Sequence, residues 1–167
     1  FFVNTSGIVP SPATLTLKRG PVAASSAAFG GQSFIFSILS DITVPVFNGI
    51  AEFNDVEIFE GTLLTQTYTY SARIPNQKFI LPNVGVDTDL ITVSVRPNEA
   101  STTETKYSVQ NSLFDVNSDS KVYYLQEIED ERYQIFFGDG IFGKALEDGN
   151  FITINYITSD GDSANGL

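Results

Sequence analysis

The sequence predicts an all-β protein, mainly strand with little helix, built as an antiparallel sandwich or as barrel-like sheets of about ten short strands. The apolar residues are mostly Phe, Tyr, Ile, Val and Leu, accompanied by Thr and Ser. Aromatic and β-branched side chains suit the half-buried surface of a sheet. Short apolar runs alternate with Gly, Pro, Asn and Asp, and no long stretch repeats apolar residues at helical spacing.

About ten segments carry the strand pattern: residues 13–17, 33–39, 42–47, 56–72, 76–83, 89–98, 105–110, 121–128, 132–137 and 150–157. Pro45 has no amide hydrogen to donate, so we expect residues 42–47 at a sheet edge or a bulge. In residues 56–72, threonines alternate with larger side chains, which places the two sets on opposite faces of a strand. The threonines are Thr65, Thr67 and Thr69, and the larger side chains are Gln66, Tyr68 and Tyr70.

The 167 residues are enough for one domain with a substantial core. We expect an N-terminal arm or linker with one short strand over residues 1–30 and a β-rich domain over residues 31–158. Residues 159–167 read as a linker to a missing C-terminal region, because they are small, polar and rich in Gly and Asp. The chain contains no Met, so we expect it to be part of a longer polypeptide.

Twenty acidic against nine basic residues give a net charge of −11, and the few Lys and Arg are scattered from Lys18 to Lys144. Such a chain repels a phosphate backbone, so we expect no nucleic-acid partner. The acid excess favours a solvated surface, and the alternative is a surface that docks on a basic partner or binds cations. No run approaches the ~18 apolar residues of a membrane span, so no membrane partner is expected.

The chain contains no Cys, His or Trp. Thiol nucleophiles, disulfides, zinc sites with Cys or His ligands and Ser-His-Asp triads are therefore excluded within it. We expect no catalytic, cofactor-binding or metal-binding residues and no cofactor.

The stretch "FFGDGIFG" contains Gly138, Gly140 and Gly143 in the G-x-G-x-x-G spacing of a dinucleotide-binding loop. That site needs a helix opening at the third glycine, and the turn signal at Asp148-Gly149 leaves no room for one. Gly accepts positive φ and Asp tolerates it, so these residues are typical of tight turns. The predicted structural-turn residues are Gly138, Asp139, Gly140, Gly143, Asp148 and Gly149.

Asp115, Asn117 and Asp119 fall at the first, third and fifth positions of a calcium-binding loop. Ser120 replaces the required glycine, and Gln126 stands where a bidentate glutamate is needed. We therefore predict a solvated turn, and the question of a weak cation site near Asp115 stays open.

The run "QEIEDER" offers carboxylates at Glu127 and Glu129 that could in principle serve a glycosidase. We favour a charged hairpin in which both point to solvent and Asp130-Glu131 form the tip. Five tyrosines either form a binding platform or pair across strands, and the sequence leaves both open. They are Tyr68, Tyr70, Tyr123, Tyr124 and Tyr156.

The order of several segments resembles the baseplate wedge proteins of contractile-tailed bacteriophages, the baseplate J-like family, and is most similar to the T-even type. The segments are "GTLLTQTYTY", "NQKFILPNVGVDTDLITVSV" and "VYYLQEIEDERYQIFFGDGIFGKALEDGNFITINYI". The F-G-D-G motif is weakly specific, whereas the ordered set, over residues 31–166, is more specific. Family proteins are much longer, and this chain matches their middle β-rich part.

The resemblance implies a non-enzymatic structural protein of the virion tail baseplate, assembled in the host cytoplasm. It implies other copies of the chain and other baseplate wedge proteins as partners, with a homodimer within the full-length assembly. The wedges join into a ring around the hub, and this ring rearranges on sheath contraction. The alternative hypothesis is a receptor- or carbohydrate-binding β module of a phage tail, and a third is an acid-pair hydrolase.

Overall fold

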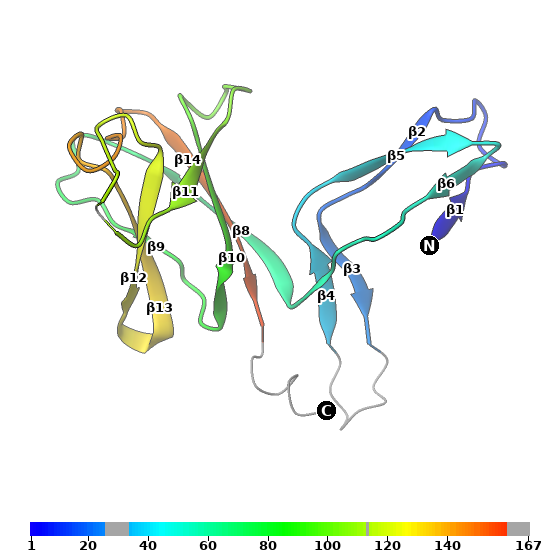
Figure 1. Cartoon of the computed structure of the whole chain (residues 1–167), viewed down its shortest axis with the longest axis horizontal. Coiled ribbons are helices and arrows are strands. Elements are labelled where there is room, and N and C mark those ends of the chain that lie inside the picture. The colour runs from blue at the N-terminus through cyan, green and yellow to red at the C-terminus, as the bar shows by residue number, and fades with distance from the viewer. Residues whose placement is uncertain (26–33, 113, 160–167) are drawn as a thin grey trace. The chain divides into compact units, whose positions relative to one another are not determined.

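The computed structural model describes residues 1–25, 34–112 and 114–159. In this part of the chain the elements are strands, apart from the 3₁₀ turn η1 (Glu129–Glu131), so the predicted all-β class is confirmed. The described residues divide into two compact units, one up to Leu63 and one from Leu64 onward (Figure 1). None of the described elements is a helix long and apolar enough to cross a membrane.

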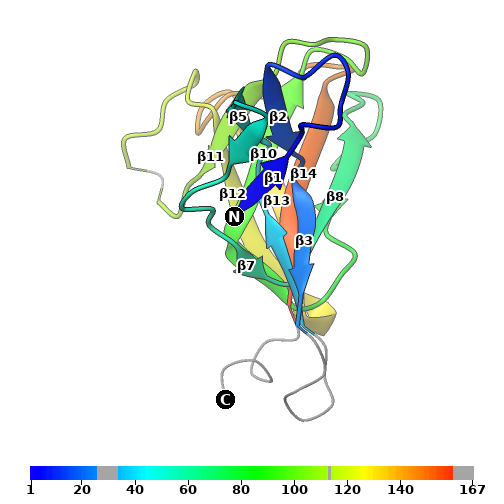
Figure 2. The same ribbon diagram turned by 90° about the vertical axis from the view of Figure 1, so that its right-hand side faces the viewer.

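The first unit contains two small sheets, whose strands face the viewer in Figure 2. The four-stranded sheet has the order β1 (Phe2–Asn4), β6 (Ile50–Glu52), β5 (Ile42–Phe47) and β2 (Thr14–Leu17). The three-stranded sheet has the order β3 (Gly20–Ala24), β4 (Ile35–Ile38) and β7 (Phe59–Glu60). All neighbours in both sheets are antiparallel.

The two sheets share one antiparallel ribbon. The segment with β2 and then β3 runs antiparallel to the segment with β4 and then β5, so that β2 pairs with β5 and β3 pairs with β4. Asp41 lies where the two sheets meet along this ribbon. Its carboxylate accepts hydrogen bonds from Lys18 Nζ at 2.6 Å and from the Arg19 amide at 2.9 Å. Both bonds lower the pKa of Asp41, and the Lys18 bond has the larger effect. The pair is solvent-exposed, so it sets the local register more than it stabilises the fold.

Every predicted segment overlaps an observed strand, but the sequence misses β1, β3 and β6. It predicts one short strand in residues 1–30, whereas the described part of that range contains three. The missed strands are short, lack clear alternation and exist because neighbouring strands pair with them. The edge position expected for β5 is wrong, since β5 lies between β6 and β2. Its pairing with β6 is confined to Val46 and Phe47, however, so the ladder on that side does not include Pro45.

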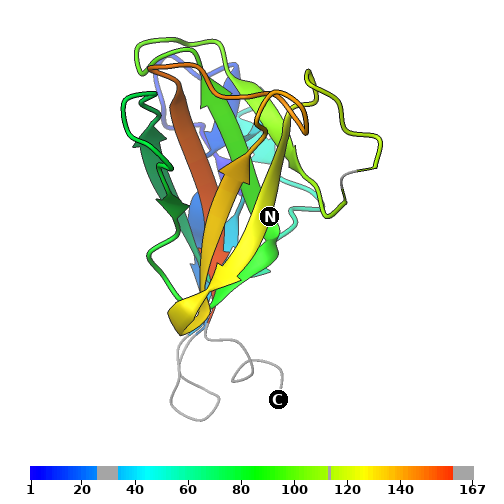
Figure 3. The same ribbon diagram turned by 90° about the vertical axis from the view of Figure 1, so that its left-hand side faces the viewer.

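The second unit is built on a seven-stranded sheet (Figures 1 and 3). Its order is β8 (Thr62–Thr69), β14 (Phe151–Thr158), β10 (Val86–Arg96), β11 (Thr105–Val109), β12 (Val122–Ile128), β13 (Arg132–Phe137) and β9 (Phe79–Ile80). β11 and β12 are parallel, and every other pair with a defined register in this sheet is antiparallel. The boundaries predicted for the β-rich domain, residues 31 and 158, stay a prediction, and residues 160–167 lie outside the described residues.

The seven-stranded sheet curls into a nearly closed barrel, so that β12 and β13 lie over β10 and β14 (Figure 3). The Tyr123 hydroxyl on β12 donates to the Ile91 carbonyl on β10 at 3.2 Å, across an intervening strand. The core between them is fully buried, as Ile135, Ile152 and Ile154 are each 0% exposed. Strand alternation places these side chains inward, which is the packing that period two predicts.

Tyr68 closes the barrel at its open side, between the terminal strands β8 and β9. Its hydroxyl donates to the Ile80 carbonyl, and its ring meets Phe79 edge to face at 5.4 Å between centroids. Phe79 packs in the same way on Phe137 at 5.6 Å, and Phe137 on Tyr107 at 5.5 Å. The line of four rings therefore links β8, β9, β13 and β11 through the core. The alternation predicted for β8 is also confirmed. Thr65, Thr67 and Thr69 are exposed, whereas Gln66, Tyr68 and, directly after the strand, Tyr70 are half-buried.

Replacing Tyr68 with Phe keeps the ring contact and removes the hydrogen bond to Ile80. We expect Tyr68→Phe to lower the free energy of unfolding by about 1 kcal/mol, because a partly buried carbonyl loses its donor. The measurement is urea unfolding followed by circular dichroism. Tyr70→Phe is the matched control, since the Tyr70 hydroxyl has no hydrogen bond among the described residues. Equal loss in the two variants would contradict a closing role for Tyr68.

Burial raises the pKa of four tyrosines above the ordinary value of 10.0: Tyr68, Tyr107, Tyr123 and Tyr156. The folded chain therefore holds these protons more tightly than the unfolded chain does. Their contribution to stability is present below about pH 10 and is lost as the pH rises through the raised pKa values. We expect the urea midpoint to fall as the pH is raised above about 10, with a smaller fall in Tyr123→Phe. A midpoint independent of pH in that range would contradict this.

Candidate functional site: the glycine loop and the adjoining hollow

The loop that follows β13 is organised by one carboxylate. Asp139 Oδ1 accepts hydrogen bonds from the amides of Ile141 and Phe142, both at 2.9 Å. Both bonds lower the pKa of Asp139, and the Phe142 bond has the larger effect. The Gly140 amide donates to the Gly143 carbonyl at 3.0 Å and closes the loop. The result is a tight turn in which the amides of Gly140, Ile141 and Phe142 donate within the loop itself.

The three glycines of this loop are required for different reasons. A Cβ on Gly138 would lie 2.1 Å from the carbonyl carbon of Gly143, so the two backbones meet too closely for any side chain. Gly140 has open space around it but a φ of 89°, a conformation that residues with a Cβ rarely adopt. Gly143 combines a φ of 99° with a Cβ position 2.8 Å from Val122 Cγ2. The spacing of the glycines thus fits a close backbone crossing.

The geometry does not fit a dinucleotide site. The Gly143 amide donates to the Asn117 carbonyl at 3.1 Å, and the Lys144 amide donates to the Ser120 carbonyl at 2.8 Å. The residues between Gly143 and β14 form no helix whose amides could face a pyrophosphate. Asn117 and Ser120 are not predictable from the sequence as partners of this loop, because no local pattern links them to the glycines.

The second predicted turn is joined to the end of β8. Gly149 has a φ of 86°, and its amide donates to the Tyr70 carbonyl at 2.9 Å. The Tyr70 amide in turn donates to the Asn150 carbonyl at 2.8 Å. Asp148 Oδ1 accepts from the Ala72 amide at 2.8 Å. These bonds support the proposal that Asp148 and Gly149 serve as structural turn residues.

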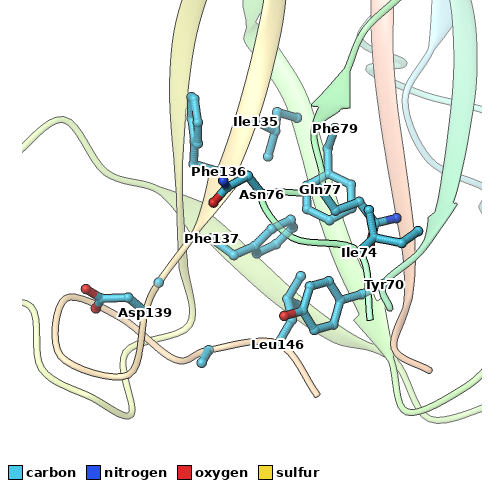
Figure 4. Close-up of a pocket in the computed structure, with 12 residues that line it drawn as sticks. Tyr70, Ile74, Asn76, Gln77, Phe79, Ile135, Phe136, Phe137, Asp139 and Leu146 are labelled. Atoms are coloured by element: carbon cyan, nitrogen blue, oxygen red, sulfur yellow. The ribbon is translucent and has the colours of Figure 1, made fainter. Parts of the chain in front are cut away.

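A hollow of about 410 Å³ lies between the glycine loop and the segment before β9 (Figure 4). Its lining residues are Tyr70, Ile74, Asn76, Gln77, Phe79, Ile135, Phe136, Phe137, Gly138, Asp139, Ala145 and Leu146. The side chains of Tyr70, Phe137 and Leu146 gather at one side, whereas the Asp139 carboxylate points away from them. The Gln77 side chain is used for hydrogen bonds within the chain. Its oxygen accepts from the Ser71 amide, and its nitrogen donates to the Thr69 carbonyl. Asp139 is the only acid in this lining, so the hollow lacks the pair of carboxylates that glycoside hydrolysis requires.

The acidic run forms the hairpin expected from the sequence. β12 and β13 pair from Tyr123 and Phe137 up to Ile128 and Arg132, and η1 makes the tip. Glu127 and the three residues of η1 are exposed, and the Arg132 guanidinium contacts one of them, Asp130, at 3.2 Å. The carboxylates lie at an open tip and line no cleft among those described.

The five tyrosines do not form one platform. Tyr123 and Tyr156 are each only 2% exposed, so both belong to the core. The Tyr156 hydroxyl donates to Asn83 Oδ1 at 2.7 Å, and Tyr68 closes the barrel. The hydroxyls of four of the five tyrosines are used for internal hydrogen bonds instead of a binding surface: Tyr68, Tyr123, Tyr124 and Tyr156.

Asn117 turns the chain at the candidate calcium loop. Its side-chain oxygen accepts from the Asp119 amide at 2.9 Å and from the Ser120 hydroxyl at 3.2 Å. Among the residues that the structure describes, no group of three or more acidic side chains could hold a metal ion. The segment is an Asn-centred turn that supports the glycine loop.

The curled sheet defines the class of the second unit as an all-β, barrel-like domain. The family described as bacteriophage baseplate wedge protein gp6, third domain, matches residues 62–161, more than half of the chain. The chain belongs to this family and so has a structural role in a phage tail baseplate, among other baseplate proteins. A comparison with curated proteins finds no match.

Substitutions at two glycines distinguish the effect of the close backbone crossing at Gly138 from the effect of the positive φ at Gly140. We expect Gly138→Ala to cost about 3 kcal/mol, because its Cβ would overlap the Gly143 backbone. Gly140→Val should cost about 1–2 kcal/mol, since it forces a β-branched residue into positive φ without a clash. Thermal unfolding by calorimetry measures both.

Gly7→Ala is the control, because a Cβ there meets nothing within 4 Å and its φ is not positive. An unchanged melting midpoint in Gly140→Val would contradict the turn role of that residue. Neither loop variant should acquire or lose nucleotide affinity.

Proposed function

We propose that the chain is a non-enzymatic assembly domain of a baseplate wedge that helps to form the ring around the hub, and that this ring rearranges on sheath contraction. The family match over residues 62–161 carries the proposal, because it spans β8 to β14 and the entire curled sheet. The internal hydrogen bonding of the glycine loop supports it, since that loop offers no free set of donors to a substrate.

The proposed partners are other copies of the chain, as a homodimer within the full-length assembly, and other wedge proteins. The net charge of −11 supports protein contacts rather than nucleic-acid contacts. We propose no cofactor, assembly in the host cytoplasm and a final location in the virion. Residues 31–158 serve as the assembly domain, residues 1–30 as its N-terminal arm and residues 159–167 as a linker.

A receptor- or carbohydrate-binding module of a phage tail is the second candidate. One observation favours it: the hollow of about 410 Å³ combines aromatic side chains with the amide of Asn76. Stacking on aromatic rings and amide hydrogen bonds suit a ligand pocket. The burial of Tyr123 and Tyr156 removes the broader surface on which this hypothesis depended.

The test is immunogold electron microscopy of the phage that encodes this chain, with antibody raised against the chain. We expect gold at the base of the contractile tail. Label on fibre tips would support the binding module, and particles left unlabelled after disruption would overturn the wedge assignment. Pre-absorption of the antibody with the purified chain is the control.

A further inference from the structure

One face of the four-stranded sheet in the first unit is apolar and uncovered. Ile50 on β6 lies opposite Phe47 on β5, and Glu52 lies opposite Phe2 on β1. Residues opposite each other across strands share a face, as do residues two apart along one strand. Pro45 therefore shares the face with Phe47. Phe2, Pro45, Phe47, Ile50 and Glu52 are here called the β5–β6 face.

The exposure of this face is unusual for large apolar side chains. Phe47 is 72% exposed and Phe2 is 68% exposed, and Ile50 between them is 40% exposed. On the opposite side of the same sheet, Ala51 is fully buried and Phe53, which follows β6, is 2% exposed. The unit thus has its interior on that other side, and adjacent exposed apolar residues of this kind mark an interaction surface.

A hollow of about 430 Å³ gives the β5–β6 face a definite shape. It is lined by Val44, Pro45, Phe47, Asn48, Ile50, Glu52 and Asn54. Of the residues on the β5–β6 face, Pro45, Phe47 and Ile50 are apolar and Glu52 carries a carboxylate, and Asn48 and Asn54 add amides to the lining. An apolar wall with a few convergent polar groups is the usual composition of a recognition pocket.

Glu52 determines the sign of the charge that this pocket accepts. It is exposed, and none of the ion pairs among the described residues involves it. Lys18 and Arg19 are the only basic residues of the first unit. The Lys18 ammonium and the Arg19 backbone amide both bond Asp41, and neither contact involves Glu52. The pocket is therefore apolar with one uncompensated negative charge, which fits a partner with a basic group beside an apolar side chain.

We propose that the β5–β6 face docks an extended polypeptide segment of another protein, with an apolar side chain in the hollow and a lysine or arginine opposite Glu52. A second copy of this chain fits less well, because two copies that each carry a net charge of −11 repel one another. The proposal goes beyond the assembly role above, since this face precedes the residues that match the wedge family.

Three labelled eight-residue peptides, acetylated and amidated at their ends, test the proposal with the full chain. One alternates Val and Lys, one alternates Val and Glu, and one alternates Ser and Lys. We expect the Val-Lys peptide to bind about tenfold more tightly than the other two in fluorescence anisotropy. In amide NMR spectra, it should shift the signals of Phe47, Ile50 and Glu52.

Two substitutions on the face provide the decisive comparison. Phe47→Ser should weaken Val-Lys binding about tenfold, and Glu52→Lys should reverse the preference, so that the Val-Glu peptide binds better. Phe114→Ser is the control for Phe47, because Phe114 is 85% exposed and lies in the second unit. Unchanged melting midpoints show that each variant is folded.

Equal binding of all three peptides would overturn the proposal, as would binding that both substitutions leave unchanged. Dimerisation in sedimentation velocity that Phe47→Ser abolishes would overturn it too, by assigning the face to a second copy. The wedge assignment is tested separately by the immunogold experiment, so either idea can fail alone.

Discussion

The second unit depends on the closure of its seven-stranded sheet by aromatic side chains. The sheet ends at β8 on one side and β9 on the other, and β9 is only two residues long. Backbone pairing alone therefore cannot complete the barrel there. The hydroxyl of Tyr68 and the rings of Phe79, Phe137 and Tyr107 supply the missing contacts. Edge-to-face packing of this kind stabilises beyond simple burial, and here it also specifies which strands face each other.

The glycine loop follows from the same closed geometry. Gly138 and Gly143 cross so closely that neither tolerates a side chain. The amides of Gly143 and Lys144 bond the carbonyls of Asn117 and Ser120 and hold the loop against that turn. The amides that a phosphate would need are bonded within the chain. A motif that resembles a nucleotide-binding fingerprint thus serves a structural purpose in a baseplate wedge family protein. In the first unit, by contrast, the apolar side chains of the β5–β6 face are exposed to solvent.

Much of the fold could be predicted because alternation is a local property of the chain. The face pattern of β8 and the acidic hairpin were both correct for this reason. Strands without alternation, such as β1 and β3, were missed because their pairing comes from distant segments. Pro45 alone predicts a sheet edge or a bulge, whereas β5 has neighbours on both sides along different parts of its length. The glycine spacing indicates the candidate loop, but no local pattern indicates its partners Asn117 and Ser120.

The sequence by itself determined the all-β class, the positions of the tight turns and the exclusion of thiol and histidine chemistry, because these depend on residue types and short-range spacing. Only the tertiary structure decided which tyrosines are buried, that the Gly138 and Gly143 backbones cross, and that Phe2, Phe47 and Ile50 share an open face. Those features depend on strand register and sheet curvature. Both arise from contacts between residues far apart in the chain, and no local pattern encodes them.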